Sequence, residues 1–216
     1  MSFASVSFLL FFLVVLLLLL LVQRVLPFAE IKRRIICQGI LLIASYVFYG
    51  WWNMRLCLLL MGITWISFFT AVKKDEKHLR QSRISLLIGV GTPLAVLGIF
   101  KYYDFFVTSF CDVFHLTPGV LNLILPVGIS FYTFQALSYT IDVYTGKIEK
   151  EKSFLQFALY LSFFPQLVAG PIVKASEFLP QLKENRKVTL AGLESGIQIF
   201  VFGMFKKVVL LSLIHI

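Results

Sequence analysis

Polar residues follow one face of an otherwise apolar segment near the middle of the chain. Ser130, Gln135, Ser138 and Asp142 lie within residues 125–146 (LPVGISFYTFQALSYTIDVYTG), at spacings of three, four and eight that share a helix face. Such a stripe must face other helices or water rather than lipid. It predicts either polar contacts between helices or the wall of a substrate path, and Gln135 and Asp142 are its candidate lining residues.

A second candidate site lies where prolines and a glycine interrupt an apolar run, in FFPQLVAGP (163–171). Proline removes a backbone donor and glycine loosens helix geometry. Irregular backbone at membrane depth is tolerated only where protein or a water-filled cavity surrounds it. We therefore expect this segment to line a cavity, the alternative being an ordinary interfacial helix that ends at proline. Its candidate substrate-path residues are Pro165, Gln166, Gly170 and Pro171.

Residues suited to catalysis or metal binding are missing from the membrane segments. His78 lies in a basic loop, His115 in an outer connection and His215 beside the last residue, so none is placed as an intramembrane general base. The sequence has no GxSxG, HExxH, Walker or GxGxxG motif. Its three cysteines are scattered without a CxxC pair. We predict neither a catalytic nor a metal-binding residue in this chain.

The composition indicates that lipid is the solvent. Hydrophobic residues make up 59% of the chain and charged residues 14%, and the mean hydropathy is +0.88. A soluble domain has roughly 45–50% apolar and about 25% charged residues. The net charge of +9 comes from short clusters between apolar runs, without a long basic stretch interleaved with aromatics. That arrangement argues against a nucleic-acid partner.

The apolar runs predict five crossings and an orientation. The expected spans are 3–22, 35–49, 56–72, 84–100 and about 123–143. Successive connections carry 4, 1, 5, 1 and 3 lysines and arginines, which places the N-terminus outside by the positive-inside rule. The first run lacks a cleavage pattern and is expected to stay as an anchor.

The alternation of loop charge breaks after the fifth span. The run 154–169 is followed by Lys174, Lys183, Arg186 and Lys187, which would lie outside if the run crossed completely. We expect it to enter the membrane and turn back. The run 190–213 contains Lys206 and Lys207, which are costly at the bilayer centre, so its helix should end or bend near Phe205 or lie along the interface. The fold class expected is an all-α polytopic transmembrane bundle with broken or re-entrant helices, forming one domain over 1–216.

Five stretches together resemble a known family. In order and spacing, the chain is similar to the N-terminal part of membrane-bound O-acyltransferases of the alginate O-acetyltransferase group, and the similarity extends over nearly all of it. The stretches are FYGWWN (48–53), KYYDFF (101–106), 125–146, FFPQLVAGPIVKASEFLPQL (163–182) and GMFKKVV (203–209). The resemblance implies a partial fold of that family, in which many helices surround a funnel across a bacterial inner membrane.

The resemblance also implies an activity. Acetyl groups from a cytoplasmic donor, acetyl-CoA, would move toward the hydroxyl of an extracellular polysaccharide such as alginate, with an extracytoplasmic acetyltransferase as partner protein. No bound cofactor is expected. Alternatives from other classes are a transporter or channel subunit, because transporters also use broken helices, and a non-catalytic membrane scaffold.

The family's catalytic histidine lies in a WHISL-like sequence, with a second, HG-type histidine further on. Both follow GMFKKVV in the family, and neither occurs in these 216 residues. We therefore expect the chain to be an N-terminal part without catalysis of its own. Its residues 211–216 replace the family's usual Ala-Asp-Asn run and are expected to be foreign to the gene.

Overall fold

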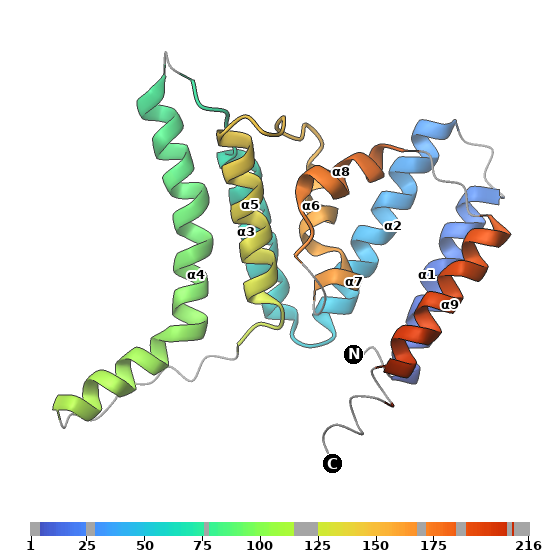
Figure 1. Cartoon of the computed structure of the whole chain (residues 1–216), viewed down its shortest axis with the longest axis horizontal. Coiled ribbons are helices and arrows are strands. Elements are labelled where there is room, and N and C mark those ends of the chain that lie inside the picture. The colour runs from blue at the N-terminus through green and yellow to red at the C-terminus, as the bar shows by residue number, and fades with distance from the viewer. Residues whose placement is uncertain are drawn as a thin grey trace. The chain divides into compact units, whose positions relative to one another are not determined.

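The computed structural model describes residues 5–24, 29–75, 78–114, 125–167, 172–184, 189–206 and 209. These residues form nine α-helices and contain no strand, which confirms the predicted all-α membrane fold (Figure 1). The helices are α1 (Val6–Arg24), α2 (Glu30–Gly50), α3 (Met54–Thr70), α4 (Leu79–Phe114), α5 (Ile129–Tyr144), α6 (Phe154–Ser162), α7 (Phe164–Leu167), α8 (Ala175–Lys183) and α9 (Leu190–Phe205).

Among the described helices, α1 and α4 are long and apolar enough to cross a bilayer by length and composition. Two shorter helices, α3 and α9, are also apolar. Each apolar run of the sequence has become a helix, and the broken run has become the separate helices α6 and α7.

The helix α4 is longer than the sequence predicts. The expected span stops at Phe100, but the helix continues to Phe114. Residues 101–114 contain no glycine or proline, so nothing in the backbone ends the helix there. The C-terminal part of α4, light green in Figure 1, bends away from the direction of the first part.

The chain divides into two compact units, one made of residues 1–37 and 184–216 and the other of residues 38–183. The first unit contains α1 and α9. Phe8, Val15 and Val22 of α1 are buried at seven-residue spacing, while α9 buries none of its residues. The expectation of a single domain stays a prediction.

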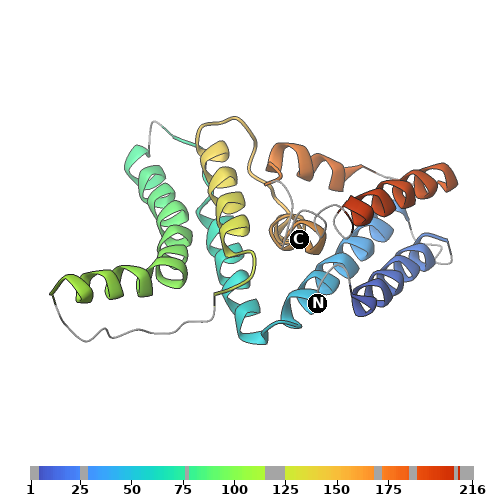
Figure 2. The ribbon, with the colours of Figure 1, turned by 60° about the horizontal axis from the view of Figure 1, so that its bottom comes forward.

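The second unit holds the helices that carry both polar stretches predicted from the sequence, 125–146 and 163–171. In it α4 packs on α3 and α5, α3 also packs on α5 and α6, and α8 packs on α6 and α5. Figure 2 shows α3 and α5 side by side from a second direction. Its core encloses four buried tyrosines, whose hydroxyls need partners inside the protein: Tyr49, Tyr132, Tyr139 and Tyr160.

Gly89 allows α4 to approach its neighbours closely. A Cβ atom at Gly89 would lie 2.5 Å from Thr70 Oγ1 and 3.0 Å from Thr140 Cγ2, whereas a Cβ at Gly91 meets nothing within 4 Å. Alanine stabilises a helix by up to about 1 kcal/mol relative to glycine. Overpacking a tight contact destabilises the fold by about 1–3 kcal/mol. We expect Gly89→Ala to lower the thermal midpoint of the detergent-solubilised protein and Gly91→Ala to maintain or raise it. Equal midpoints for the two variants would contradict this packing.

Candidate functional site

The broken segment returns to the end of the bundle from which it starts. The helix α6 has nine residues and is therefore about 13–14 Å long, far short of the hydrocarbon core of about 30 Å. Phe163 leaves the helical conformation before α7 begins. Glu151 precedes α6 and Lys183 ends α8, and their Oε2 and Nζ atoms lie 2.7 Å apart. This ion pair joins the two ends of the segment, as expected for re-entry.

The break between α6 and α7 is held by α2. The backbone N–H of Phe164 donates to Ser45 Oγ at 3.2 Å, and the ring of Phe164 packs on that of Phe48 with centroids 5.7 Å apart. The hydroxyl of Ser45 donates in turn to Leu41 O at 2.8 Å. One serine thus satisfies a backbone donor that the interrupted helix leaves free.

A glycine brings the two polar stretches of the sequence into contact. Gly128 precedes α5 with a φ of +75°, and a Cβ atom there would lie 2.2 Å from the carbonyl oxygen of Leu167. Both the left-handed backbone and the close approach require glycine. The start of the polar-faced helix α5 therefore rests directly on the end of α7.

Tyr160 connects the elements of the site and is not among the site residues predicted from the sequence. Its hydroxyl donates to Val173 O at 3.1 Å and lies 3.5 Å from Gln135 O. Its own carbonyl accepts from Gln166 Nε2 at 2.9 Å. One feature of the sequence could have indicated this role: Tyr160 is a tyrosine in an apolar run just before the proline break. A buried tyrosine hydroxyl needs a hydrogen-bond partner.

The predicted path residues occupy different environments. Gln135 is 2% exposed, and its Oε1 has no hydrogen-bond partner among the described residues. Asp142, two turns along α5, accepts from Ser138 Oγ at 3.4 Å and lies 3.7 Å from Lys147 Nζ. Pro165 is exposed. Gly170 and Pro171 lie outside the described residues. The hydroxyl of Tyr160 lies near the Gln135 backbone carbonyl, and its own backbone carbonyl holds the Gln166 side chain.

Further buried polar atoms lie on α2 and α5. The hydroxyls of Tyr49 and Tyr132 are close enough to interact electrostatically, but their alignment forms no hydrogen bond. An unmade hydrogen bond at a buried group costs about 1–3 kcal/mol. Ordered water, a polar ligand or further protein is needed to satisfy these atoms. Within the described part of the chain, the unsatisfied atoms of α5 are Tyr132 Oη, Thr133 Oγ1 and Gln135 Oε1.

The opposite end of α5 is basic and tightly connected. Besides its pair with Lys183, Glu151 accepts at Oε1 from the backbone N–H groups of Lys152 and Ser153, at 2.9 and 3.1 Å. Its own N–H donates to Tyr139 Oη at 2.9 Å. Burial raises the pKa of Glu151, but the hydrogen bonds and the Lys183 charge outweigh burial and hold that pKa below its usual value.

Six lysines gather in the segments at this end, which we call the basic end. Lys74 N donates to Tyr144 O at 3.1 Å, which joins two of these segments. Lys150 Nζ lies 5.5 Å from the centre of the Phe68 ring, and burial lowers the pKa of Lys150. The basic end therefore brings lysines and carboxylates together where α3, α5 and α8 finish, and Asp142 and Glu151 pair with two of these lysines. Its lysines are Lys73, Lys74, Lys147, Lys150, Lys152 and Lys183.

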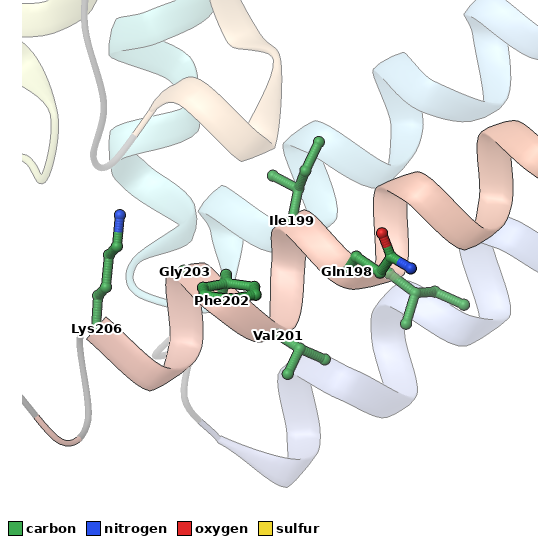
Figure 3. A pocket seen from close by; sticks show the side chains of 7 residues that line it. Gln198, Ile199, Val201, Phe202, Gly203 and Lys206 are labelled. Carbon is green, nitrogen blue, oxygen red and sulfur yellow. The ribbon is translucent and has the colours of Figure 1, made fainter.

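A separate hollow of about 660 Å³ lies on the first unit (Figure 3). All of its described lining residues belong to α9 or to Lys206 just beyond it. Most are apolar, such as Ile199 and Phe202, and none is a predicted path residue. A hollow lined by a single helix is an exposed apolar face rather than a formed site.

Comparison with known proteins identifies the family. The model of the membrane-bound O-acyltransferase family matches residues 147–216. A probable alginate O-acetylase of Pseudomonas putida is 38% identical over 175 residues, which cover 78% of this chain and 36% of that protein. This chain belongs to the membrane-bound O-acyltransferase family. The resemblance inferred from the sequence is thereby confirmed.

Two further relatives of this membrane-bound O-acyltransferase chain are also named for O-acetylation. A probable alginate O-acetylase of Pseudomonas aeruginosa is 38% identical, over 78% of this chain and 34% of its own length. A peptidoglycan O-acetyltransferase of Helicobacter pylori is 36% identical, over 79% of this chain and 37% of its own length. The chain thus spans about a third of the relatives it matches. No solved structure matches it.

Proposed function

We propose that the protein containing these residues is an O-acetyltransferase of the bacterial inner membrane. It takes an acetyl group from acetyl-CoA on the cytoplasmic side and passes it across the membrane for O-acetylation of an extracellular, alginate-like polysaccharide. An extracytoplasmic acetyltransferase is its partner protein, and the N-terminus lies outside. The single observation that carries this proposal is family membership, supported by relatives whose names describe O-acetylation.

The charge distribution supports a cytoplasmic donor. The nucleotide of acetyl-CoA is highly charged and cannot enter hydrocarbon, so only its thioester arm reaches membrane depth. The basic end attracts the phosphates, because clustered lysines raise the local concentration of an anionic substrate. By the positive-inside rule this end faces the cytoplasm.

In this proposal the broken segment and α5 form part of the path along which the acetyl group moves. Gln135 contributes a buried acceptor that nothing else in the described structure occupies. Gln166 is oriented by Tyr160, and Asp142 stands nearest the basic end. Pro165 lies directly after the break, and Gly170 and Pro171 stay candidate path residues on the grounds of sequence. The general base that deprotonates the acceptor hydroxyl is the histidine that the family resemblance assigns beyond these residues.

The complete gene product in phospholipid vesicles provides the test. We expect transfer of labelled acetyl from acetyl-CoA supplied at the cytoplasmic face. Gln135→Leu should lower the rate about tenfold or more, which corresponds to about 1.4 kcal/mol of barrier. Gln81→Leu, at an exposed position of α4, is the matched control and should keep the wild-type rate.

Two outcomes separate the alternatives. Solute or ion flux without acetyl transfer by the wild type would replace the enzyme with a transporter. Acetyl transfer that Gln135→Leu leaves unchanged would keep the enzyme but remove Gln135 from its path.

A further inference from the structure

The helix α4 is too long for one straight crossing. Its 36 residues extend about 54 Å at 1.5 Å per residue, while the hydrocarbon core is about 30 Å thick. The excess has to leave the hydrocarbon at one end. The N-terminal end of α4 follows the basic end of the bundle, so the bent C-terminal part lies at the other end (Figures 1 and 2).

Residues 101–114, which we call the aromatic arm, are strongly amphipathic. Four aromatic side chains recur at every fourth position and are all exposed, so they form one stripe along the helix. Two ring pairs follow this stripe, with centroids 6.4 and 4.5 Å apart. The stripe consists of Tyr102, Phe106, Phe110 and Phe114.

Polar residues occupy the other side of the arm, with the exposed Phe105 at their edge. At 100° per residue, Lys101, Asp104, Thr108 and Asp112 fall within one sector of the helix opposite the aromatic stripe. A helix that crosses hydrocarbon has no need of such a polar sector, and a helix in water has no need of exposed aromatic rings. A helix in the plane of the membrane interface needs both.

The arm also follows a part of α4 that exposes apolar side chains. Preceding residues of α4, including Leu87, Leu94 and Ile99, are exposed apolar side chains of a membrane-spanning helix. Aromatic rings concentrate at the headgroup level of membrane proteins. At the same end of the second unit, Trp51 and Trp52 are exposed as well.

We propose that the aromatic arm is a membrane-interface helix, with its aromatic stripe inserted at the boundary between phospholipid headgroups and acyl chains. The bend in α4 turns the helix from the crossing direction into the membrane plane. The arm thereby fixes the depth of α4 in the bilayer, and α4 positions the α3 and α5 helices against which it packs. This inference does not depend on the proposed enzyme activity.

Depth measurements on the complete protein test the proposal. Every cysteine of that protein, including Cys37, Cys57 and Cys111, is first replaced with serine, and the protein is reconstituted in phospholipid vesicles. A nitroxide is then attached to one introduced cysteine at a time, and its accessibility to oxygen and to a water-soluble nickel chelate gives its depth. The four variants are Phe106→Cys and Phe114→Cys on the aromatic stripe, and Asp104→Cys and Asp112→Cys on the polar sector.

An interfacial arm puts both aromatic positions at nearly the same depth, about 5–10 Å below the headgroup boundary, and both polar positions nearer to water. A helix continuing straight across would separate the members of each pair, eight residues apart, by about 12 Å. That separation would overturn the proposal. Full exposure of all four positions to the nickel chelate, or shielding of the stripe from both reagents by a protein partner, would overturn it equally.

Discussion

Replacing Gly128 with alanine is expected to destabilise the second unit severely. The left-handed backbone at Gly128 costs a residue with a side chain about 1–3 kcal/mol. The new methyl group would also overlap the carbonyl oxygen of Leu167, since the Cβ position lies 2.2 Å from it. Because that obstacle is backbone, relief requires α7 to move away from α5, at a further cost of about 1–3 kcal/mol.

Gly146 provides a matched control for this prediction. Its φ of +76° is nearly the same, but the nearest atom to an added Cβ is the flexible Lys73 side chain at 3.3 Å. Gly146→Ala should therefore show only the backbone strain. The two variants are compared by thermal unfolding in detergent, with loss of the monodisperse peak as the measure of unfolding. If Gly128→Ala lost no more stability than Gly146→Ala, the contact between Gly128 and Leu167 would be wrong.

The second large effect is expected from the ion pair that joins the ends of the re-entrant segment. Lys183→Met would leave the Glu151 carboxylate, which is 5% exposed, with two backbone donors among the residues that the structure describes. Removing one partner of a buried pair costs about 3–5 kcal/mol. The Lys183 side chain is 55% exposed, so solvent partly screens its charge. We therefore expect Lys183→Met to lower the free energy of unfolding by about 1–3 kcal/mol.

The control for this variant is Lys147→Met. Lys147 also pairs with a carboxylate, Asp142, but at 3.7 Å and with the lysine side chain 70% exposed. An exposed pair contributes about 0–1 kcal/mol. Unfolding midpoints of the two variants that agree within error would show that the Glu151 pair does not stabilise the fold.

The pH dependence of stability follows from the same pair. The folded pKa of Glu151 lies below its unfolded value, which is about 4.3. Its contribution is therefore present above that unfolded pKa and is lost as the pH falls through the folded pKa. The wild type should lose stability as the pH falls below about 4, and Lys183→Met should lose less over the same range.

The all-α membrane fold and the helix break near 163–171 were predicted well from the sequence, because both depend on local composition; entry and return of this segment in the membrane stays a prediction. Apolar runs of sufficient length become helices, and the proline within 163–171 interrupts one of them wherever the segment lies. The position of Lys183 was also informative, since an excess of lysine in a connection restricts which side of the membrane it occupies.

The contacts within the site could not be predicted in the same way. Gly128 and Leu167 are 39 positions apart, and nothing local to either indicates that their backbones meet. Tyr160 resembles any aromatic residue in an apolar run until its partners on three different segments are known. The length of α4 was missed because hydropathy falls after Phe100 while helix formation continues.

The Glu151–Lys183 pair has a consequence for biosynthesis. Glu151 emerges from the ribosome 32 residues before its partner, which is about 2 to 6 seconds at synthesis rates of about 5–20 residues per second. During that interval the carboxylate lacks the lysine with which it is paired in the folded chain. The hairpin from α6 to α8 should therefore enter the membrane only after Lys183 has been made, as one late step that follows the insertion of α5.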